Sequence, residues 1–253
     1  MGLSLTLLQS CAPGTIQRPP PPFGHQKISH IVSSFRNQEK LVQAFISSGR
    51  LILEREGSES ESNILMLGTR YPSRIKIEIT HPWGRPLLHI LIQETSLHIL
   101  SFPEKRLYLG HLGTSASLNL LPGRLDPDQV WSLVRGYPVL GIYEYANSSK
   151  PNQFTLLNGK TEIIQVIDLY PESNLPHQIS FPEQGIKVSF SDFENENGIY
   201  YAEKITLDDP ETEATLALDR NHMVFNKSIP EAVFALEIPP EFTMLPLREG
   251  LEE

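Results

Sequence analysis

The side chains of this sequence that could carry out chemistry are its histidines, its cysteine and its acids, and their spacing matches no catalytic pattern. No two of the eight histidines lie at the HxxxH spacing of a metal site. The sequence also lacks the G-x-S-x-G, P-loop and G-x-G-x-x-G motifs. Asp126 and Asp128 are better placed to begin a helix, and Asp208-Asp209-Pro210 is typical of a turn. We therefore predict no enzyme activity, no metal and no cofactor, although a glycosidase-type carboxylate pair, for example with Glu78 or Glu203, stays open.

The remaining reactive group is the thiol of Cys11, the one cysteine of the chain, so an internal disulfide is impossible. A short apolar run ends in Leu8-Gln9-Ser10-Cys11, which resembles the lipobox of bacterial lipoproteins. No Lys or Arg precedes Cys11, whereas a signal peptide usually begins with one. We predict that residues 1–10 are a truncated or atypical signal peptide and that Cys11 is lipidated. A chance cysteine in a frayed terminus is the alternative.

A proline-rich segment follows the cysteine. Residues 11–24 contain the run Pro19 to Pro22, which favours an extended polyproline conformation that cannot pack into a core. At about 3 Å per residue this segment could span about 40 Å, as a membrane tether would. A PxxP ligand for a signalling domain is the rival interpretation. Because Ala12 rather than Asp follows the cysteine, the sorting rule of lipoproteins implies the outer membrane.

The charge of the chain excludes one class of partner. The net charge is −9 and no run of basic residues is present, which argues against binding to nucleic acid. The acidic tail, residues 248–253, is typical of a solvated surface. No apolar stretch reaches the length of a spanning helix.

The body of the chain, residues 25–247, is predicted to be one domain that begins with a helix and continues as strands. The helix rests on apolar residues at helical spacing, which are Ile28, Ile31, Val32 and Phe35, with a possible continuation through Leu41, Val42, Phe45 and Ile46. Residues 74–79 alternate strictly between charged residues and isoleucine, as a strand with one buried face would. Short gaps with turn residues separate many further strands, which favours an antiparallel meander. A second helix is predicted to begin at Asp126-Pro127-Asp128-Gln129.

Several predicted strands are apolar on both faces, notably residues 64–67, 87–92 and 163–167. Either helices cover one face while another element covers the other, or the sheet curls round an apolar cavity. A well-packed two-layer sandwich is the alternative. The residues that we predict to line a cavity are Ile75, Ile77, Ile79, Leu88, Ile90, Ile92, Val188 and Phe190.

The combination of a lipobox, a leading helix and a run of antiparallel strands resembles the LolA/LolB family. The nearest local matches are the hairpin His81-Pro82-Trp83-Gly84-Arg85-Pro86, which an apolar strand follows, and the closing segment from Phe234 to Phe242, with its Pro239-Pro240 pair. The resemblance implies a mainly β fold, in which a curved antiparallel half-barrel is closed by a few helices over an apolar cavity. It also implies that the apolar residue at the hairpin tip inserts into the membrane. Trp83 takes that place here, flanked by Pro82 and Gly84, and a tryptophan suits a lipid–water interface. The alternative is that Trp83 is a core residue.

The resemblance further implies a function, which we state as an expectation. A lipid-anchored protein facing the periplasm would bind acyl chains of lipoproteins or lipids in the cavity and help to place them in the outer membrane. Its partners would be the bilayer, the cargo and a periplasmic LolA-like carrier. The alternative is a structural or sensing lipoprotein of the same fold that binds a protein partner, as RseB-like stress regulators do.

Overall fold

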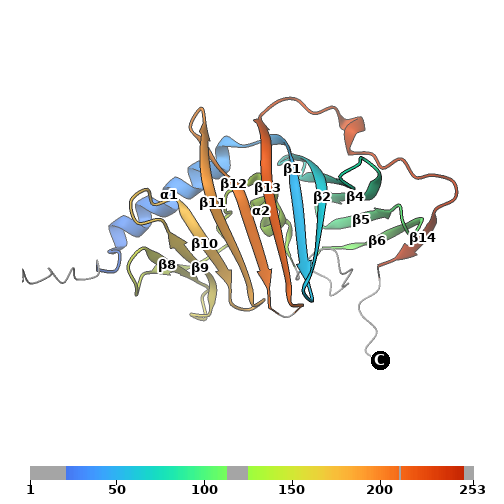
Figure 1. Ribbon diagram of the computed structural model, residues 1–253. Helices are drawn as coiled ribbons and strands as arrows, with labels where there is room; N and C mark the ends of the chain where they lie inside the picture. Colours follow the sequence, from blue (N-terminus) through green and yellow to red (C-terminus); the bar gives the residue numbers. More distant parts are fainter. Residues whose placement is uncertain (1–20, 113–124, 211, 248–253) are drawn as a thin grey trace, which may run out of the picture.

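The computed structural model describes residues 21–112, 125–210 and 212–247, which form one large β-sheet, two α-helices and a short 3₁₀ helix (Figure 1). The signal peptide predicted at residues 1–10, the lipidation site Cys11, the first part of the tether and the acidic tail at residues 248–253 lie outside the described residues.

The leading helix, α1, runs from His25 to Leu41. It forms as predicted, because its apolar residues recur at helical spacing and are all buried, namely Ile28, Ile31, Val32 and Phe35. The predicted continuation holds only as far as Leu41, which ends the helix and is 45% exposed; from Val42 onward it is wrong, because the backbone of Val42 is extended, with φ −111° and ψ 109°. Phe45 and Ile46 belong instead to a strand, where they pack into different apolar clusters. Helical and strand spacing overlap in this short apolar run, and sheet pairing decides between them.

Among the described residues the sheet has fourteen strands, in the spatial order β14-β6-β5-β4-β3-β2-β1-β13-β12-β11-β10-β9-β8-β7. Every neighbouring pair is antiparallel except β14 and β6, which are parallel. The strands are β1 (Ala44–Arg55), β2 (Ser58–Thr69), β3 (Arg74–Thr80), β4 (Pro86–Gln93), β5 (Ser96–Ser101), β6 (Arg106–His111), β7 (Tyr145–Asn147), β8 (Gln153–Leu157), β9 (Ile163–Leu169), β10 (Pro176–Phe181), β11 (Ile186–Glu196), β12 (Ile199–Asp209), β13 (Ala214–Phe225) and β14 (Thr243–Pro246). The prediction of a mainly β fold built on an antiparallel meander is confirmed. Since the strands join into one sheet, the alternative of two stacked sheets does not hold.

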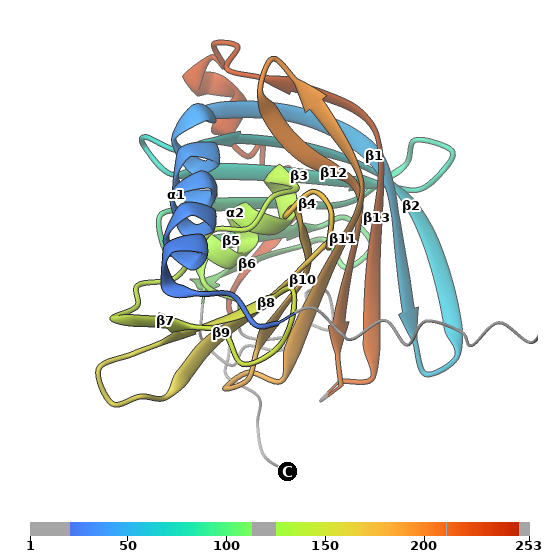
Figure 2. The same cartoon turned by 90° about the vertical axis from the view of Figure 1, so that its left-hand side faces the viewer.

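The sheet is curved, and α1 and α2 lie on its inner side (Figure 2). Helix α2 runs from Pro127 to Arg135 and begins with the capping box that the sequence predicts. The Asp126 carboxylate accepts a hydrogen bond from the backbone N–H of Gln129 at 2.8 Å, and the Gln129 side chain accepts one from the backbone N–H of Asp126, also at 2.8 Å. Gly136 ends the helix in the left-handed conformation, with φ +81°.

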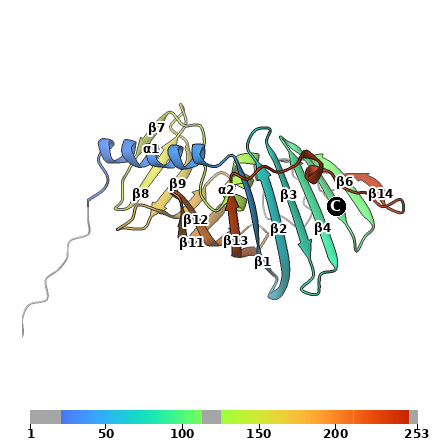
Figure 3. The ribbon, with the colours of Figure 1, turned by 90° about the horizontal axis from the view of Figure 1, so that it is seen from above.

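The outer face of the sheet is covered in part by a C-terminal segment, residues 227–242, which we call the strap. The strap contains the 3₁₀ helix η1 (Glu231–Phe234) and crosses the sheet to reach β14 at the far edge (Figure 3). Phe234 forms a second buried cluster with Leu67 of β2 and Leu91 of β4, against which Ile229, Val233 and Leu236 pack. The doubly apolar character of residues 64–67 and 87–92 is thereby explained: helices cover one face and the strap covers the other.

Candidate functional site

Six of the eight residues predicted to line a cavity lie opposite one another on β3 and β4. Directly opposite residues of antiparallel strands point to the same face of the sheet. All six side chains are buried, so they form one apolar block on the inner face. The three pairs are Ile75 with Ile92, Ile77 with Ile90, and Ile79 with Leu88.

The other two predicted residues, Val188 and Phe190, lie on β11 in the other half of the sheet. Val188 pairs with Leu207 of β12 and with Ile179 of β10, and Phe190 pairs with Ile205. All these side chains belong to the same continuous cluster of buried apolar residues as the block on β3 and β4. The apolar inner face therefore extends over most of the width of the sheet.

Aromatic side chains fill the space between the inner face and the two helices. Phe35 of α1 packs against Tyr137, with ring centroids 5.3 Å apart, and against Phe154 of β8 at 6.1 Å. Trp131 of α2 packs edge-on against Phe45 of β1 at 5.3 Å. Large side chains thus occupy the interior, and an acyl chain could enter only if a helix or these rings moved. The sequence pattern does not mark Tyr137 and Phe154 as core residues. Tyr137 lies outside any helix or strand, and Phe154 lies on β8, where three consecutive residues are buried and no single face stands out.

Two arginines are buried beneath the helices. The Arg220 guanidinium of β13 donates to the carbonyl oxygens of Leu133 (2.6 Å) and Val134 (2.8 Å) in the last turn of α2, and to that of Ala202 (2.6 Å). Arg135 donates to the carbonyl of Gln38 in the last turn of α1 at 2.6 Å. Burial lowers the pKa of Arg220 to about 9 and that of Arg135 to about 10, so both stay charged at neutral pH. Each positive charge meets the negative end of a helix dipole.

The hairpin between β3 and β4 presents Trp83 to solvent. Trp83 is 86% exposed, so the alternative that it is a core residue is wrong. The backbone N–H of His81 donates to the carbonyl of Arg85 at 2.8 Å, and that of Gly84 donates to the carbonyl of His81 at 2.7 Å. Gly84 has φ +84°, a conformation that favours glycine. Pro82, Trp83 and Gly84 therefore sit together at the tip of a tight turn.

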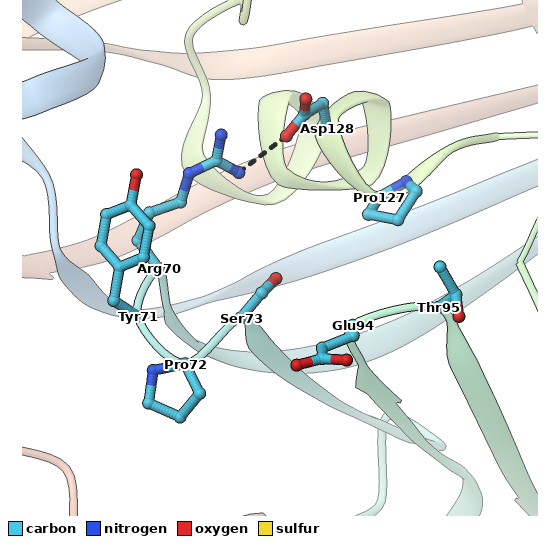
Figure 4. Close-up of a pocket in the computed structure, with 8 residues that line it drawn as sticks. All are labelled: Arg70, Tyr71, Pro72, Ser73, Glu94, Thr95, Pro127 and Asp128. Carbon is cyan, nitrogen blue, oxygen red and sulfur yellow. Dashed lines mark hydrogen bonds and ion pairs between the residues drawn. The ribbon is translucent and has the colours of Figure 1, made fainter.

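A pocket of about 430 Å³ opens at the opposite end of β3 (Figure 4). It is built from the β2–β3 turn, the β4–β5 turn and the first turn of α2. The Arg70 guanidinium bridges two carboxylates there: it lies 2.8 Å from Asp128 and 3.0 Å from Glu39. The lining residues are Arg70, Tyr71, Pro72, Ser73, Glu94, Thr95, Pro127 and Asp128.

Solved structures match this chain in three dimensions, although no family model and no curated protein matches its sequence. A DUF1329 family protein from Desulfovibrio piger superimposes with a TM-score of 0.57 at 12% identity, over 82% of this chain and 97% of that one. A LolA superfamily protein from Nitrosomonas europaea superimposes with a TM-score of 0.52 at 13% identity, over 81% of this chain and 96% of that one. The chain has the LolA-like fold. At these identities the likeness concerns the fold alone.

The LolA-like fold accounts for the sequence resemblance on which the prediction was based. Helix α1 precedes the meander, the hairpin at residues 81–86 joins two apolar strands, and the closing segment from Phe234 to Phe242 leads to the last strand. Within the described residues no three His, Cys, Asp or Glu side chains gather closely enough to hold a metal ion. No helix in the same part of the chain is long and apolar enough to cross a membrane.

Proposed function

We propose that this protein binds the acyl chains of lipids or lipoproteins against the apolar inner face of its sheet and helps to place them in the outer membrane. Lipidated Cys11 would tie the protein to that membrane on its periplasmic side, and a periplasmic LolA-like carrier could supply the cargo. The observation that supports this most is the inner face itself. Two helices lie across a sheet face whose isoleucine and leucine side chains form one continuous apolar surface.

The energetics of an acyl chain suit such a surface. Each CH₂ group that leaves water contributes about 0.8 kcal/mol, so a bound acyl chain would offset part of the free energy of separating a helix from the sheet. Transfer would then follow relative affinity, from a weaker apolar site to a stronger one and finally to the bilayer. Because this route needs neither a covalent step nor ATP, it agrees with a chain that carries no recognisable catalytic motif.

Trp83 supports the membrane part of the proposal. An indole that is almost fully exposed on a hairpin tip adds little to the core of the folded protein, whereas it gains free energy at a lipid–water interface. The hairpin lies at one end of β3, beside the apolar block, so insertion of Trp83 would bring the edge of the inner face to the membrane surface.

Titration of the full chain with a fluorescent fatty-acid probe tests the proposal. We expect saturable binding, with competition by unlabelled fatty acid, and co-purification of lipid that mass spectrometry detects. Ile90→Trp adds volume within the apolar block and should lower probe binding, whereas Ile142→Glu, at a site that is 96% exposed, should not. Thermal unfolding of each variant shows whether it is folded. Absence of saturable uptake by the folded wild-type protein would overturn acyl binding.

A second candidate is a structural or sensing lipoprotein that binds a protein partner. The tightly filled interior favours it, as does an exposed apolar patch at the free edge of the sheet. Tyr145 of β7 and Ile163 of β9 flank Leu157 of β8 in register, and Ile142 precedes β7.

A photo-crosslinker placed at position 142 or 83 separates the two candidate functions. Protein adducts that form at 142 and vanish with Tyr145→Glu support the partner role, and lipid adducts at 83 support delivery.

A further inference from the structure

The pocket at the end of β3 lies where the apolar interior reaches the rim of the sheet. Its floor is the hydrogen bond from the backbone N–H of Glu94 to the carbonyl of Ser73, at 3.0 Å. The next rung pairs Arg74 with Gln93, and the rung after that is the buried pair of Ile75 and Ile92. Pro127 and Asp128, which also line the pocket, form the first turn of α2. Val130 and Trp131, later in the same helix, belong to the core. A molecule held in the pocket is therefore two rungs from the apolar block.

The carboxylates around this pocket outnumber its cations. Both Nη atoms of Arg70 are already engaged, one by Asp128 and one by Glu39. Glu94 also lines the pocket, and its carboxylate makes no ion pair among the residues that the structure describes. Glu39 lies outside the lining and is bound by Arg36 as well. The lining itself therefore carries two carboxylates, those of Asp128 and Glu94, and one guanidinium. The pocket attracts a cationic group and repels an anion.

The aromatic side chain at the mouth favours the same charge. Tyr71 is 79% exposed and lines the pocket together with Pro72 and Pro127 (Figure 4). The face of a tyrosine ring attracts ammonium groups, as the aromatic cages of choline-binding sites do. The start of α2 does not compete for an anion, because the Asp126 carboxylate already caps its backbone N–H groups. A volume of about 430 Å³ is within the range of small-ligand pockets.

We propose that this pocket holds the ammonium headgroup of a zwitterionic phospholipid or similar lipid, while its acyl chains lie along the inner face. This inference rests on the proposed acyl binding and adds a headgroup preference to it. The length of an acyl chain is compatible with the length of β3. An acyl chain in one leaflet occupies about 15 Å, which is half of the hydrocarbon core. The seven residues of β3 span about 23 Å. A lipid held at the pocket would direct its chain ends toward the Trp83 rim.

The experiment uses competition among headgroups on one surface, so that the protein meets all three lipids at the same concentration; the pocket variants below separate the headgroup site from the overall charge of the protein. The full chain is incubated with vesicles of equimolar dioleoyl phosphatidylcholine, phosphatidylethanolamine and phosphatidylglycerol, and the lipids that it retains are measured by mass spectrometry. We expect the two ammonium lipids to be enriched about five-fold over phosphatidylglycerol, as one exposed ion pair and one cation–π contact would give.

Three variants then locate the preference. Glu94→Gln and Tyr71→Leu should each bring the ratio toward one while the total bound lipid stays the same. Glu59→Gln, an exposed acid at the start of β2 and so at the far end of that strand from the pocket, should leave the five-fold ratio intact. If the wild-type protein retains lipid but holds the three lipids in equal amounts, the headgroup site is overturned while acyl binding stands. The pocket would then fit a basic side chain of a protein partner instead. If no lipid is retained at all, acyl binding fails and this inference fails with it.

Discussion

The imidazole of His81 stacks on the indole of Trp83, with ring centroids 4.0 Å apart and an angle of 16° between the ring planes. This contact favours one direction for the indole at the tip of the β3–β4 hairpin. If Trp83 inserts into a membrane as proposed, an indole already held in one direction loses little conformational entropy on insertion.

Substitution Trp83→Glu should weaken binding of the soluble, unlipidated domain to phosphatidylcholine vesicles about ten-fold, because it replaces an apolar ring with a charge. Vesicle flotation measures this. Zwitterionic vesicles are chosen because the net charge of −9 would oppose anionic ones. Unfolding free energy should change by less than about 0.5 kcal/mol, since the side chain makes few packing contacts. The matched control is Tyr145→Glu, an exposed aromatic on β7 at one edge of the sheet; equal losses in both variants would exclude a specific tip.

Arg220→Met should destabilise the protein by about 3 kcal/mol. The three carbonyl oxygens of Ala202, Leu133 and Val134 would lose their donors in a buried site, and the last turn of α2 would lose its cation. Urea unfolding measures the change, and Arg220→Lys should recover only part of it, because an ammonium cannot reproduce the planar fork. A variant as stable as the wild type would show that these hydrogen bonds add nothing to the net stability.

Phe234→Ala should cost about 3 kcal/mol and loosen the strap, because it empties the centre of the cluster with Leu67 and Leu91. Hydrogen exchange should increase at residues 227–242, and a dye that binds exposed apolar surface should bind more strongly. Ile238→Ala removes a more exposed strap residue and serves as the control, with a change within about 1 kcal/mol. Unaltered exchange in the strap would mean that β14 alone holds it in place.

His89 should make stability depend on pH. Burial lowers the pKa of His89, with Lys76 adding to this effect and Glu78 opposing it. The unfolded chain therefore binds a proton more readily than the folded protein does, so stability is lost as the pH falls below about 6.5 and is regained above it. In His89→Gln the difference in unfolding free energy between pH 5 and pH 7 should be smaller than in the wild type. The exposed His222 gives a control, since His222→Gln should keep the wild-type difference.

The parts of the fold that local sequence specifies could be predicted. The spacing of Ile28, Ile31, Val32 and Phe35 defines α1, the alternation at residues 74–79 defines β3, and the capping residues at 126–129 define the start of α2. The pairing of Ile77 with Ile90 follows from the short hairpin that joins their strands. In each case the decisive interactions connect residues that are near in sequence.

The parts that depend on distant contacts could not be predicted. Arg220 bonds to the carbonyl of Leu133 across 87 positions, and backbone carbonyls carry no sequence signal. The strap has neither helical nor strand periodicity. Its contact with Leu67 and Leu91 depends on the tertiary structure, so the sequence does not predict it. The pocket at the end of β3 could not be predicted either, because Tyr71, Glu94 and Asp128 come from three separate turns that only the tertiary structure brings together.

The strap has one more consequence, for the order in which the molecule is completed. The apolar outer surfaces of β2 and β4 emerge early in synthesis, yet Phe234, which shields them, emerges about 140 residues later than Leu91. One edge of the central strand β1 likewise stays unpaired until β13 has been synthesised. A nascent chain therefore exposes apolar, incompletely paired strands until about its last tenth has been synthesised. Holdase chaperones should recognise this protein throughout that interval, and truncation before Phe234 should turn it into an aggregating species.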